Sequence, residues 1–236
     1  IFENLSHYSN KLTEEKKREI VKQMWSNYGM TFVEYIFLNK FRKNNSHIKI
    51  HGMDHLEELL KDKKPLIFVS GHFANFELMS MEITKKNINL ATIYRPLNNF
   101  FLNPLMEYLR RKYICFNQIK KGRGGVKNSI EFLKKGYCVA LMIDQRVSEG
   151  EMIKFFNKKA LTTTLPAQLS KKFNVNIMPV YLERKKSDEF YMEFYKPVLI
   201  SKYKDKMSIT IKLNQILEDM IQRNPKQWIW THDRWK

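Results

Sequence analysis

The 236-residue chain is poor in cysteine, and this limits the kinds of site it can hold. Cys115 and Cys138 are its only cysteines, and both stand among apolar residues without a CxxC pair or a Cys/His cluster. This pattern argues against a disulfide framework and against structural zinc. We therefore expect two buried free thiols and no metal site.

Long apolar runs are also missing. No stretch reaches the roughly 18 to 20 apolar residues that span a bilayer, and no charged and then apolar leader precedes a small-residue cleavage site. The chain nevertheless begins at Ile1 without a methionine. We expect a membrane anchor upstream of Ile1. The absence of a long apolar run therefore applies only to residues 1–236.

Acidic residues are outnumbered, with 24 Asp and Glu against 42 Lys and Arg, which gives a net charge of +18. Such a balance favours an anionic membrane surface, a phosphorylated substrate or an acidic protein partner. No nucleic-acid partner is predicted, because the basic residues are spread along the chain without a zinc-finger, RNP or compact basic-helix pattern. Most of the excess is lysine, accompanied by many asparagines, which biased codon usage would also produce.

Short apolar segments alternate with amphipathic segments, which predicts an α/β fold. Strands connected by helices form a mostly parallel central sheet flanked by those helices. The predicted strands are 48–51, 65–70, 90–94, 139–143 and 176–182, with an antiparallel edge strand at 190–195. The predicted helices are 53–61, one after residue 75, 101–112, 125–135, 166–173 and 206–223. This length fits one core, so we predict a single domain over 1–236.

Residues 1–45 are predicted to be a helical segment packed on that domain. Thr13 is a candidate N-cap for a helix that continues to Phe41, and Gly29 is expected to divide it into two. The second half is rich in aromatic and aliphatic residues that pack into the core or face a membrane or an acyl chain. The same two alternatives apply to Trp228, Trp230 and Trp235 near the end of the chain.

An imidazole and a carboxylate, His72 and Glu77, follow the apolar strand at 65–70. Within one helix a spacing of five residues rotates the side chain by about 500°, so the two would point apart. A bend that Gly71 permits would let the carboxylate reach the ring from the start of the next helix. One ring nitrogen would then be fixed by the carboxylate while the other removes a proton from a hydroxyl. We predict a His72–Glu77 catalytic dyad; the alternative is a surface histidine near a helix start.

Polar residues also follow the neighbouring predicted strands. Arg95 follows 90–94, and Asp144, Gln145 and Arg146 follow 139–143. Open α/β sheets bind ligands at the carboxyl ends of their strands, so these residues are candidates for substrate binding. Taken singly, Arg95 also fits a surface ion pair and Asp144 a turn or helix cap.

The glycine-rich segment 120–125 carries further basic candidates, Lys121 and Arg123, which could hold an anionic head group or a carrier protein. A solvated turn is the alternative, because no Walker pattern surrounds them. Asn75 completes the predicted substrate-binding residues.

These motifs together resemble the lysophospholipid acyltransferase superfamily, and in particular its lipid A biosynthesis branch of lauroyl and myristoyl transferases. The wider superfamily carries His-x4-Asp where this chain has His72 and Glu77. Its Pro-Glu-Gly-Thr block is replaced here by Asp144-Gln145-Arg146. This second difference makes glycerol phosphate a poor acceptor. The matching blocks cover nearly the whole chain and lie at 71–77, 94–99, 122–125, 133–136, 143–145, 155–164, 178–180 and 224–236.

The resemblance implies transfer of a fatty acyl group from an acyl carrier protein thioester to a hydroxyl of a lipid A precursor or a related glycolipid. It implies a glycerolipid acyltransferase-like fold, no cofactor, and a place on the cytoplasmic face of the bacterial inner membrane. His72 would deprotonate the hydroxyl, and Arg95 or backbone N–H groups would bind the oxyanion. No covalent acyl-enzyme is expected, because the chain has no G-x-S-x-G motif and no activated cysteine.

Other functions fit part of this pattern. One is acyl transfer to a different glycolipid or a phospholipid, and another is hydrolysis by water that His72 activates. A third is a non-catalytic module that binds anionic lipid or nucleic acid, in which His72 would be dispensable.

Overall fold

The computed structural model describes residues 1–236 except for the side chain of Arg123. In this described part of the chain, seven strands form one sheet in the order β1-β9-β8-β2-β5-β3-β4, and only β8 and β9 pair antiparallel. The predicted mostly parallel sheet is confirmed. The strands are β1 (Ile48–His51), β2 (Ile67–Ser70), β3 (Leu90–Tyr94), β4 (Asn117–Lys120), β5 (Cys138–Met142), β8 (Ile177–Arg184) and β9 (Phe190–Phe194).

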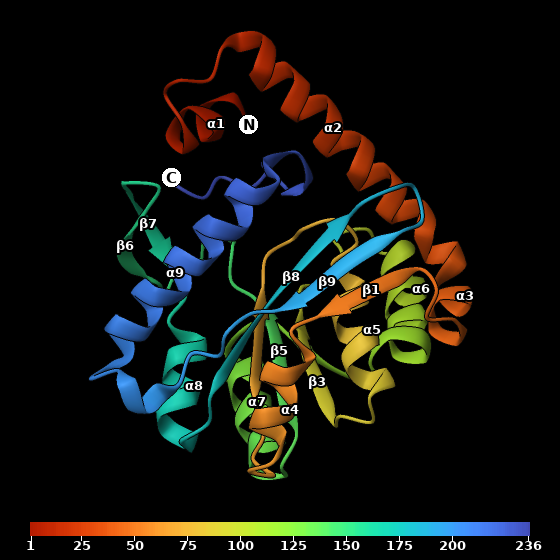
Figure 1. Ribbon diagram of the computed structural model, residues 1–236, viewed down its shortest axis with the longest axis vertical. Coiled ribbons are helices and arrows are strands. Elements are labelled where there is room, and N and C mark those ends of the chain that lie inside the picture. The colour runs from red at the N-terminus through yellow and green to blue at the C-terminus, as the bar shows by residue number, and fades with distance from the viewer.

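Helices cover both faces of the sheet (Figure 1). Ile67 and Val69 of β2 pack into one apolar core with α8 and α9, while Phe68 packs into the other core with α4 and α5. Parallel strands that are buried on both faces read as continuous apolar runs, which is why these strands were predictable. The helices are α1 (Phe2–Tyr8), α2 (Glu14–Val33), α3 (Leu38–Lys43), α4 (Met53–Leu60), α5 (Glu77–Lys85), α6 (Leu102–Leu109), α7 (Arg123–Lys134), α8 (Leu165–Phe173) and α9 (Lys206–Arg223).

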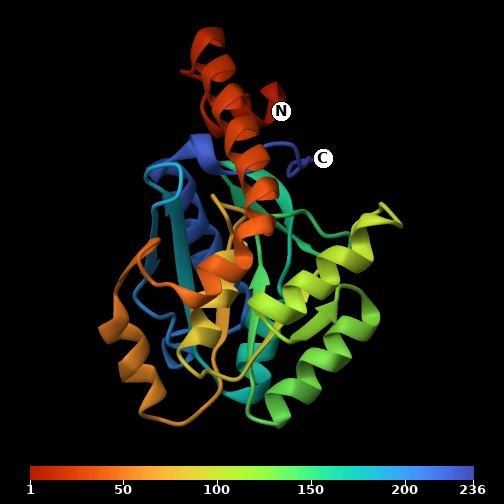
Figure 2. The same ribbon diagram turned by 90° about the vertical axis from the view of Figure 1, so that its right-hand side faces the viewer.

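The amino-terminal helix α2 begins where the sequence predicts, since the Thr13 hydroxyl accepts a hydrogen bond from the Lys16 N–H at 3.3 Å. The predicted break at Gly29 is wrong: α2 continues to Val33 and ends in the 3-10 turn η1 (Glu34–Phe37). A glycine weakens a helix by about 1 kcal/mol relative to alanine, which does not suffice to end it. Figure 2 shows α2 reaching from above the sheet down its side.

Some strands lie where no strand was predicted. β4 has one fully buried side chain, Ile119, and therefore lacks the apolar run of its neighbours. β6 (Glu151–Phe155) and β7 (Lys158–Thr162) form a separate hairpin whose turn residues Phe156 and Asn157 have left-handed φ values. β9 is antiparallel to β8 as predicted, but it is not an edge strand, because β1 pairs with its outer side.

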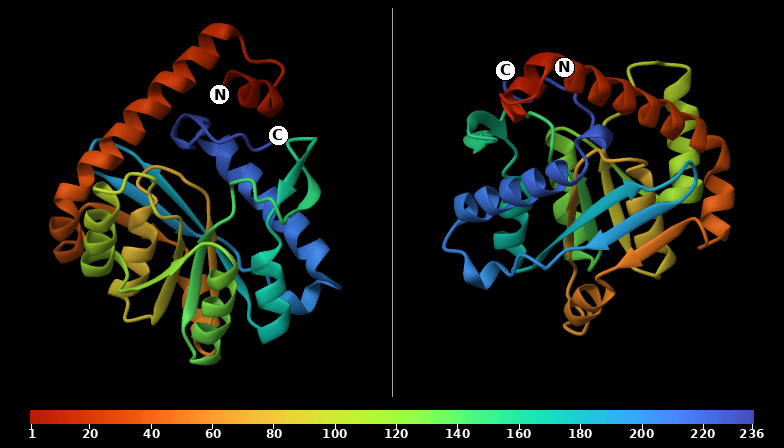
Figure 3. Two further views of the ribbon diagram at one scale, coloured as in Figure 1. Left: turned by 180° about the vertical axis from the view of Figure 1, so that it is seen from behind. Right: turned by 45° about the horizontal axis from the view of Figure 1, so that its top comes forward.

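The carboxyl-terminal segment folds back over the core beside α1. Trp228, Trp230 and Trp235 are buried, which confirms core packing over the lipid interface for these tryptophans. The Asn4 amide donates to the carbonyl of Trp230 at 2.9 Å, and the two termini lie side by side in Figure 3.

Cys115 and Cys138 are free and buried, as predicted. Among the helices that the structure describes, none combines the length and the apolar character needed to cross a bilayer. The single-domain assignment stays a prediction.

Candidate active site

A cavity of about 520 Å³ lies at the carboxyl ends of the adjacent strands β2, β5, β3 and β4. His72 follows β2, Gln145 follows β5, Arg95 follows β3 and Lys121 follows β4, and all four residues line the cavity. Strands in a sheet lie about 4.8 Å apart, so consecutive strand ends bring residues distant in sequence into one site.

The imidazole of His72 is bound by Asp144. Its Nδ1 lies 2.8 Å and 3.1 Å from the two carboxylate oxygens, and the His72 backbone N–H donates to Oδ2 at 2.9 Å. The parallel register of β2 and β5 pairs Ser70 with Met142, and His72 and Asp144 each stand two residues beyond that pair. The contact is therefore a continuation of the strand register.

Asp144 is 2% exposed, and its Oδ2 also accepts a hydrogen bond from Trp228 Nε1 at 2.8 Å. Burial alone would raise the pKa of this carboxyl, but the charge and hydrogen bonds of His72, together with the Trp228 bond, lower the pKa to about 2. An ionised carboxylate at Nδ1 fixes a proton there and leaves Nε2 as the basic nitrogen.

Glu77 does not have the predicted position next to the imidazole. Its carboxylate accepts hydrogen bonds from Arg110 Nε at 2.8 Å, from Arg110 Nη2 at 2.6 Å and from the Tyr35 hydroxyl. The expected direct contact between Glu77 and His72 is wrong. Glu77 is the first residue of α5, and its N–H donates to Asn75 Oδ1 at 3.2 Å.

The bend between His72 and Glu77 does not depend on the conformational freedom of Gly71, contrary to the prediction. At Gly71 a Cβ would lie 2.7 Å from a ring carbon of Phe73, so this glycine is required for space. Ala74 instead adopts the left-handed conformation, with φ of 46°. This is unfavourable for a residue with a Cβ and needs support from its surroundings.

Arg110 is a site residue that sequence reasoning missed. It begins the π-helical turn Arg110–Ile114 after α6, is nearly buried and lines the cavity. Among the described residues, none bonds its Nη1. Burial and the Glu77 charge raise the pKa of Tyr35 well above its usual value, so Tyr35 stays a neutral donor within this cluster. A basic residue in an amphipathic helix usually faces solvent, and its sequence context does not indicate a buried ion pair. Nothing in the sequence therefore identified Arg110 as a site residue.

Cations gather at the β3 and β4 side of the cavity. Arg95 and Lys121 lie at the ends of neighbouring strands, and the Lys121 N–H donates to the Tyr94 carbonyl at 2.8 Å. Burial and the charge of Arg95 lower the pKa of Lys121. His232 lines the same cavity from the carboxyl-terminal segment, and burial lowers its pKa. The charges of Arg95 and Lys121 held together favour an anionic ligand between them.

Aromatic side chains of α2 line another part of the cavity. Trp25, Tyr28 and Phe32 of α2 line the cavity and are also about half exposed, so this helix face lies at the opening. The aromatic-rich segment that follows is only partly packed into the core. Tyr35, Leu38 and Phe41 are buried, whereas Phe32, Ile36 and Phe37 are exposed.

The family model for bacterial lipid A biosynthesis acyltransferases matches residues 3–236. The chain belongs to this family. It is therefore an acyltransferase, as the motif resemblance implied.

Among curated proteins, this acyltransferase is 24% identical to the lipid A biosynthesis lauroyltransferase of Escherichia coli K12, over 100% of this chain and 78% of that protein. It is 25% identical to the lipid A biosynthesis palmitoleoyltransferase of the same organism, over 94% and 73%. Among solved structures, the 1-acyl-sn-glycerophosphate acyltransferase PlsC from Thermotoga maritima matches with a TM-score of 0.48 and 13% identity, over 92% of this chain and 86% of that one.

The structure of the acyltransferase reassigns several predicted substrate-binding residues. Asn75 is 0% exposed, and its side chain binds Glu34 and the N–H of Glu77. The oxygens of Asp144 are occupied by His72 and Trp228. Arg146 donates from Nε to the Lys236 carbonyl at 2.8 Å. None of these three residues lines the cavity, and their role in substrate binding stays a prediction.

Gln145, Arg95 and Lys121 do line the cavity, while the Arg123 side chain lies outside the described residues. His232 lies in the carboxyl-terminal block 224–236 and was not among the predicted site residues. The signal that could have identified it is its place among Trp228, Trp230 and Trp235, but the folding back of this segment is not visible in the sequence.

Proposed function

We propose that this enzyme transfers a fatty acyl group from an acyl carrier protein thioester to a hydroxyl of a lipid A precursor. The observation that carries the proposal is the His72–Asp144 pair at the end of a cavity with an apolar wall and a cationic side. Family membership supports a lipid A acceptor, and the relatives it matches are named for that pathway.

In the proposed reaction, Nε2 of His72 takes the proton from the acceptor hydroxyl as its oxygen attacks the thioester carbonyl. The C–S bond then breaks, and the imidazolium gives the proton to the departing thiolate. Asp144 keeps Nδ1 protonated and stabilises the imidazolium, which is the role of an orienting carboxylate. A new ester and a free thiol result, without an acyl-enzyme.

Glu77 acts in this proposal through Arg110. The Glu77 carboxylate and the Tyr35 hydroxyl occupy the Nε and Nη2 side of the guanidinium. Nη1 is buried without a partner among the described residues, and it is the donor that we propose for the oxyanion. A preorganised cationic donor of this kind stabilises the oxyanion of a tetrahedral intermediate. Arg95 or backbone N–H groups at the start of α5 remain the other candidates for that role.

Arg95, Lys121 and His232 would bind a substrate phosphate. Guanidinium and ammonium groups form short charge-assisted hydrogen bonds to phosphate oxygens. Two phosphates are available in the proposed reaction, one on the glycolipid acceptor and one in the phosphopantetheine arm of the donor. The position of the cations beside the base fits either.

The exposed aromatic face at the cavity opening would rest on the membrane. Phe100 is 83% and Phe101 85% exposed just before α6, and both belong to the cavity-flanking segment that follows Arg95. Aromatic side chains with a net charge of +18 suit an anionic bilayer surface. We propose the cytoplasmic face of the inner membrane as that surface, where acyl carrier protein thioesters are found.

A direct test incubates the purified chain with defined acyl carrier protein thioesters and a tetra-acylated lipid A precursor, and follows the products by mass spectrometry. The expected product is the precursor plus one acyl group, absent with His72→Ala. Release of free fatty acid with an unmodified precursor would instead indicate a hydrolase. If only another glycolipid or a phospholipid is acylated, the proposed lipid A acceptor is wrong and that lipid is the acceptor.

A further inference from the structure

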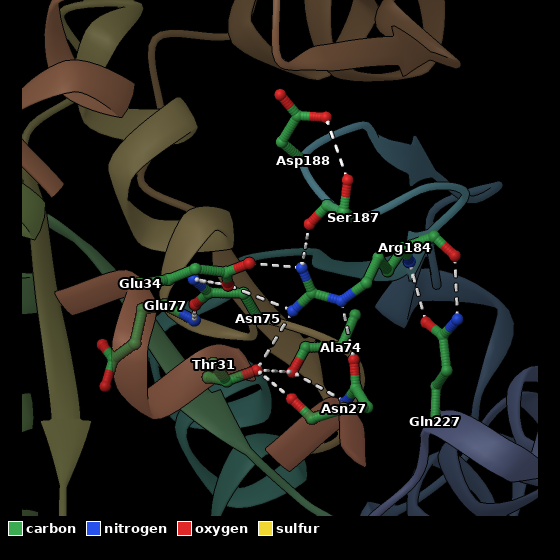
Figure 4. Close-up of polar contacts among 10 residues, drawn as sticks. All are labelled: Asn27, Thr31, Glu34, Ala74, Asn75, Glu77, Arg184, Ser187, Asp188 and Gln227. Atoms are coloured by element: carbon green, nitrogen blue, oxygen red, sulfur yellow. Dashed lines mark hydrogen bonds and ion pairs between the residues drawn. The ribbon is translucent and has the colours of Figure 1, made fainter. Parts of the chain in front are cut away.

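A buried polar network lies behind the loop that carries His72, and Arg184 is at its centre (Figure 4). Arg184 is the last residue of β8 and is 6% exposed. Its Nε donates to Asn27 Oδ1 at 2.9 Å, Nη2 donates to Thr31 Oγ1 at 3.3 Å, and Nη1 donates to the Ser187 carbonyl at 2.8 Å. The remaining two donors bind the two oxygens of the Glu34 carboxylate. All five N–H donors of the guanidinium are thus used.

Three of these partners lie on one face of the amino-terminal helix. Asn27, Thr31 and Glu34 are spaced four and three residues apart, which aligns them along the helix. Trp25 and Tyr28 of the same helix line the cavity, and so does Thr31 itself. Arg184 therefore fixes α2 and η1 against β8.

The same three side chains hold the loop between His72 and Glu77. The Thr31 hydroxyl donates to the Ala74 carbonyl at 3.0 Å, with Asn27 Nδ2 at 3.5 Å from the same oxygen. Asn75 Nδ2 donates to Glu34 Oε2 at 2.8 Å. Each of these hydrogen bonds between the loop and α2 or η1 thus involves a side chain that Arg184 also binds.

The backbone of Arg184 supports the loop from a second direction. Its N–H donates to Gln227 Oε1 and its carbonyl accepts from Gln227 Nε2, both at 2.8 Å. The Gln227 carbonyl in turn accepts from the Ala74 N–H at 3.1 Å. Ala74 has a left-handed φ that is unfavourable for alanine, so this residue depends on bonds from outside the loop.

We propose that Arg184 is a positioning residue for acyl transfer, which acts through Glu34, Thr31 and Asn27 to hold the His72 loop in its reactive conformation. This inference rests on the proposed function of His72 as the base. Since Asn75 also caps the N–H of Glu77, the same network sets the start of α5. Release of the loop would turn the imidazole away from Asp144 and lower kcat more than it changes KM.

A positioning role and a purely structural role predict different behaviour when the ion pair is replaced as a unit. Exchange of a buried ion pair for apolar residues of similar volume is often neutral for stability, whereas removal of one partner leaves an uncompensated charge. We therefore test the double variant Glu34→Leu/Arg184→Met, which removes both charges, with Arg184→Lys as a conservative variant. Arg223→Met is the matched control, because Arg223 binds Glu193 and Tyr195 and lies over Tyr181, none of which belongs to the loop.

The expected result for the double variant is a melting temperature within about 4 °C of wild type and a kcat reduced roughly 10- to 100-fold. Arg184→Lys should recover part of that loss, and Arg223→Met should keep wild-type kcat. The low-field proton NMR signal of the His72 Nδ1–H, identified by its loss in His72→Gln, should shift or broaden in the double variant and stay unchanged in Arg223→Met.

A folded double variant with wild-type kcat and an unchanged His72 signal would overturn the proposal. If the double variant does not fold, Arg184→Lys decides the question by the same two readouts. The NMR signal does not depend on turnover. It therefore tests the positioning of His72 even if the proposed acyl transfer is absent in wild type, and that absence would count against the proposed function alone.

Discussion

The two carboxylates near His72 have different surroundings, and the difference shows how this site is assembled. Glu77 is five residues from His72, yet it forms a buried ion pair with Arg110 and a hydrogen bond with Tyr35. Asp144 is 72 residues away, yet it binds the imidazole directly. Because β2 and β5 are parallel neighbours, residues that extend both strands by equal lengths meet at the sheet edge. Strand pairing, and not nearness in sequence, selects the carboxylate that binds the His72 imidazole.

The strongest test of this comparison removes each end of the His72–Asp144 pair. His72→Ala and Asp144→Asn should each lower kcat by roughly 10²- to 10⁴-fold, because one loses the base and the other loses control of its tautomer. Steady-state kinetics on the folded variants gives the result. Asp144→Asn with wild-type turnover would show that the imidazole needs no orienting carboxylate.

On the other side of the comparison, Glu77→Gln should affect stability strongly. It leaves the Arg110 guanidinium buried without its counter-charge, which costs about 3–5 kcal/mol of unfolding free energy. Urea unfolding of the variant beside wild type measures this. We also expect a smaller loss of kcat than for Asp144→Asn. A larger loss of kcat for Glu77→Gln than for Asp144→Asn would indicate that Glu77 is the carboxylate that orients His72.

Arg95 and Lys121 allow a further comparison, between the His72–Asp144 pair and the basic residues beside it. These two residues follow β3 and β4, which lie on the side of β5 away from β2. Replacement of either by alanine should raise KM roughly 10- to 100-fold through loss of a charged hydrogen bond worth about 1.5–3 kcal/mol, with kcat little changed. Lys127→Ala, at an exposed position on α7, is the matched control. KM measured separately for donor and acceptor identifies which phosphate is bound, and an effect confined to kcat would place Arg95 at the oxyanion instead.

The smallest expected effect concerns acid stability. The folded pKa of Asp144 is about 2, below its ordinary value of 3.8, so the ionised form stabilises the fold above about pH 4. This contribution is about 2 kcal/mol, because each tenfold change in proton affinity corresponds to roughly 1.4 kcal/mol, and it is lost as the pH falls through about 2. Unfolding free energies at pH 5, 4, 3 and 2 should fall more steeply for wild type than for Asp144→Asn. Equal slopes would assign the acid sensitivity to other carboxylates.

Much of the fold was predictable because its central strands are buried on both faces. β3 and α9 have the predicted bounds, and β2, β5 and β8 differ by one or two residues. β4 and the β6–β7 hairpin were not predicted, since their side chains are mostly exposed or polar and resemble loop sequence.

The sequence by itself determined the parallel sheet, the place of His72 at a strand end, and the cationic strand ends beside it, because apolar periodicity and local spacing encode these. The tertiary structure alone decided that Asp144 binds His72 and that Glu77 binds Arg110. It also decided that Arg184 binds the side chains of α2 and η1 that contact the His72 loop. Each of these contacts joins residues from separate elements, and their distances depend on strand order and helix packing that no local pattern of residues specifies.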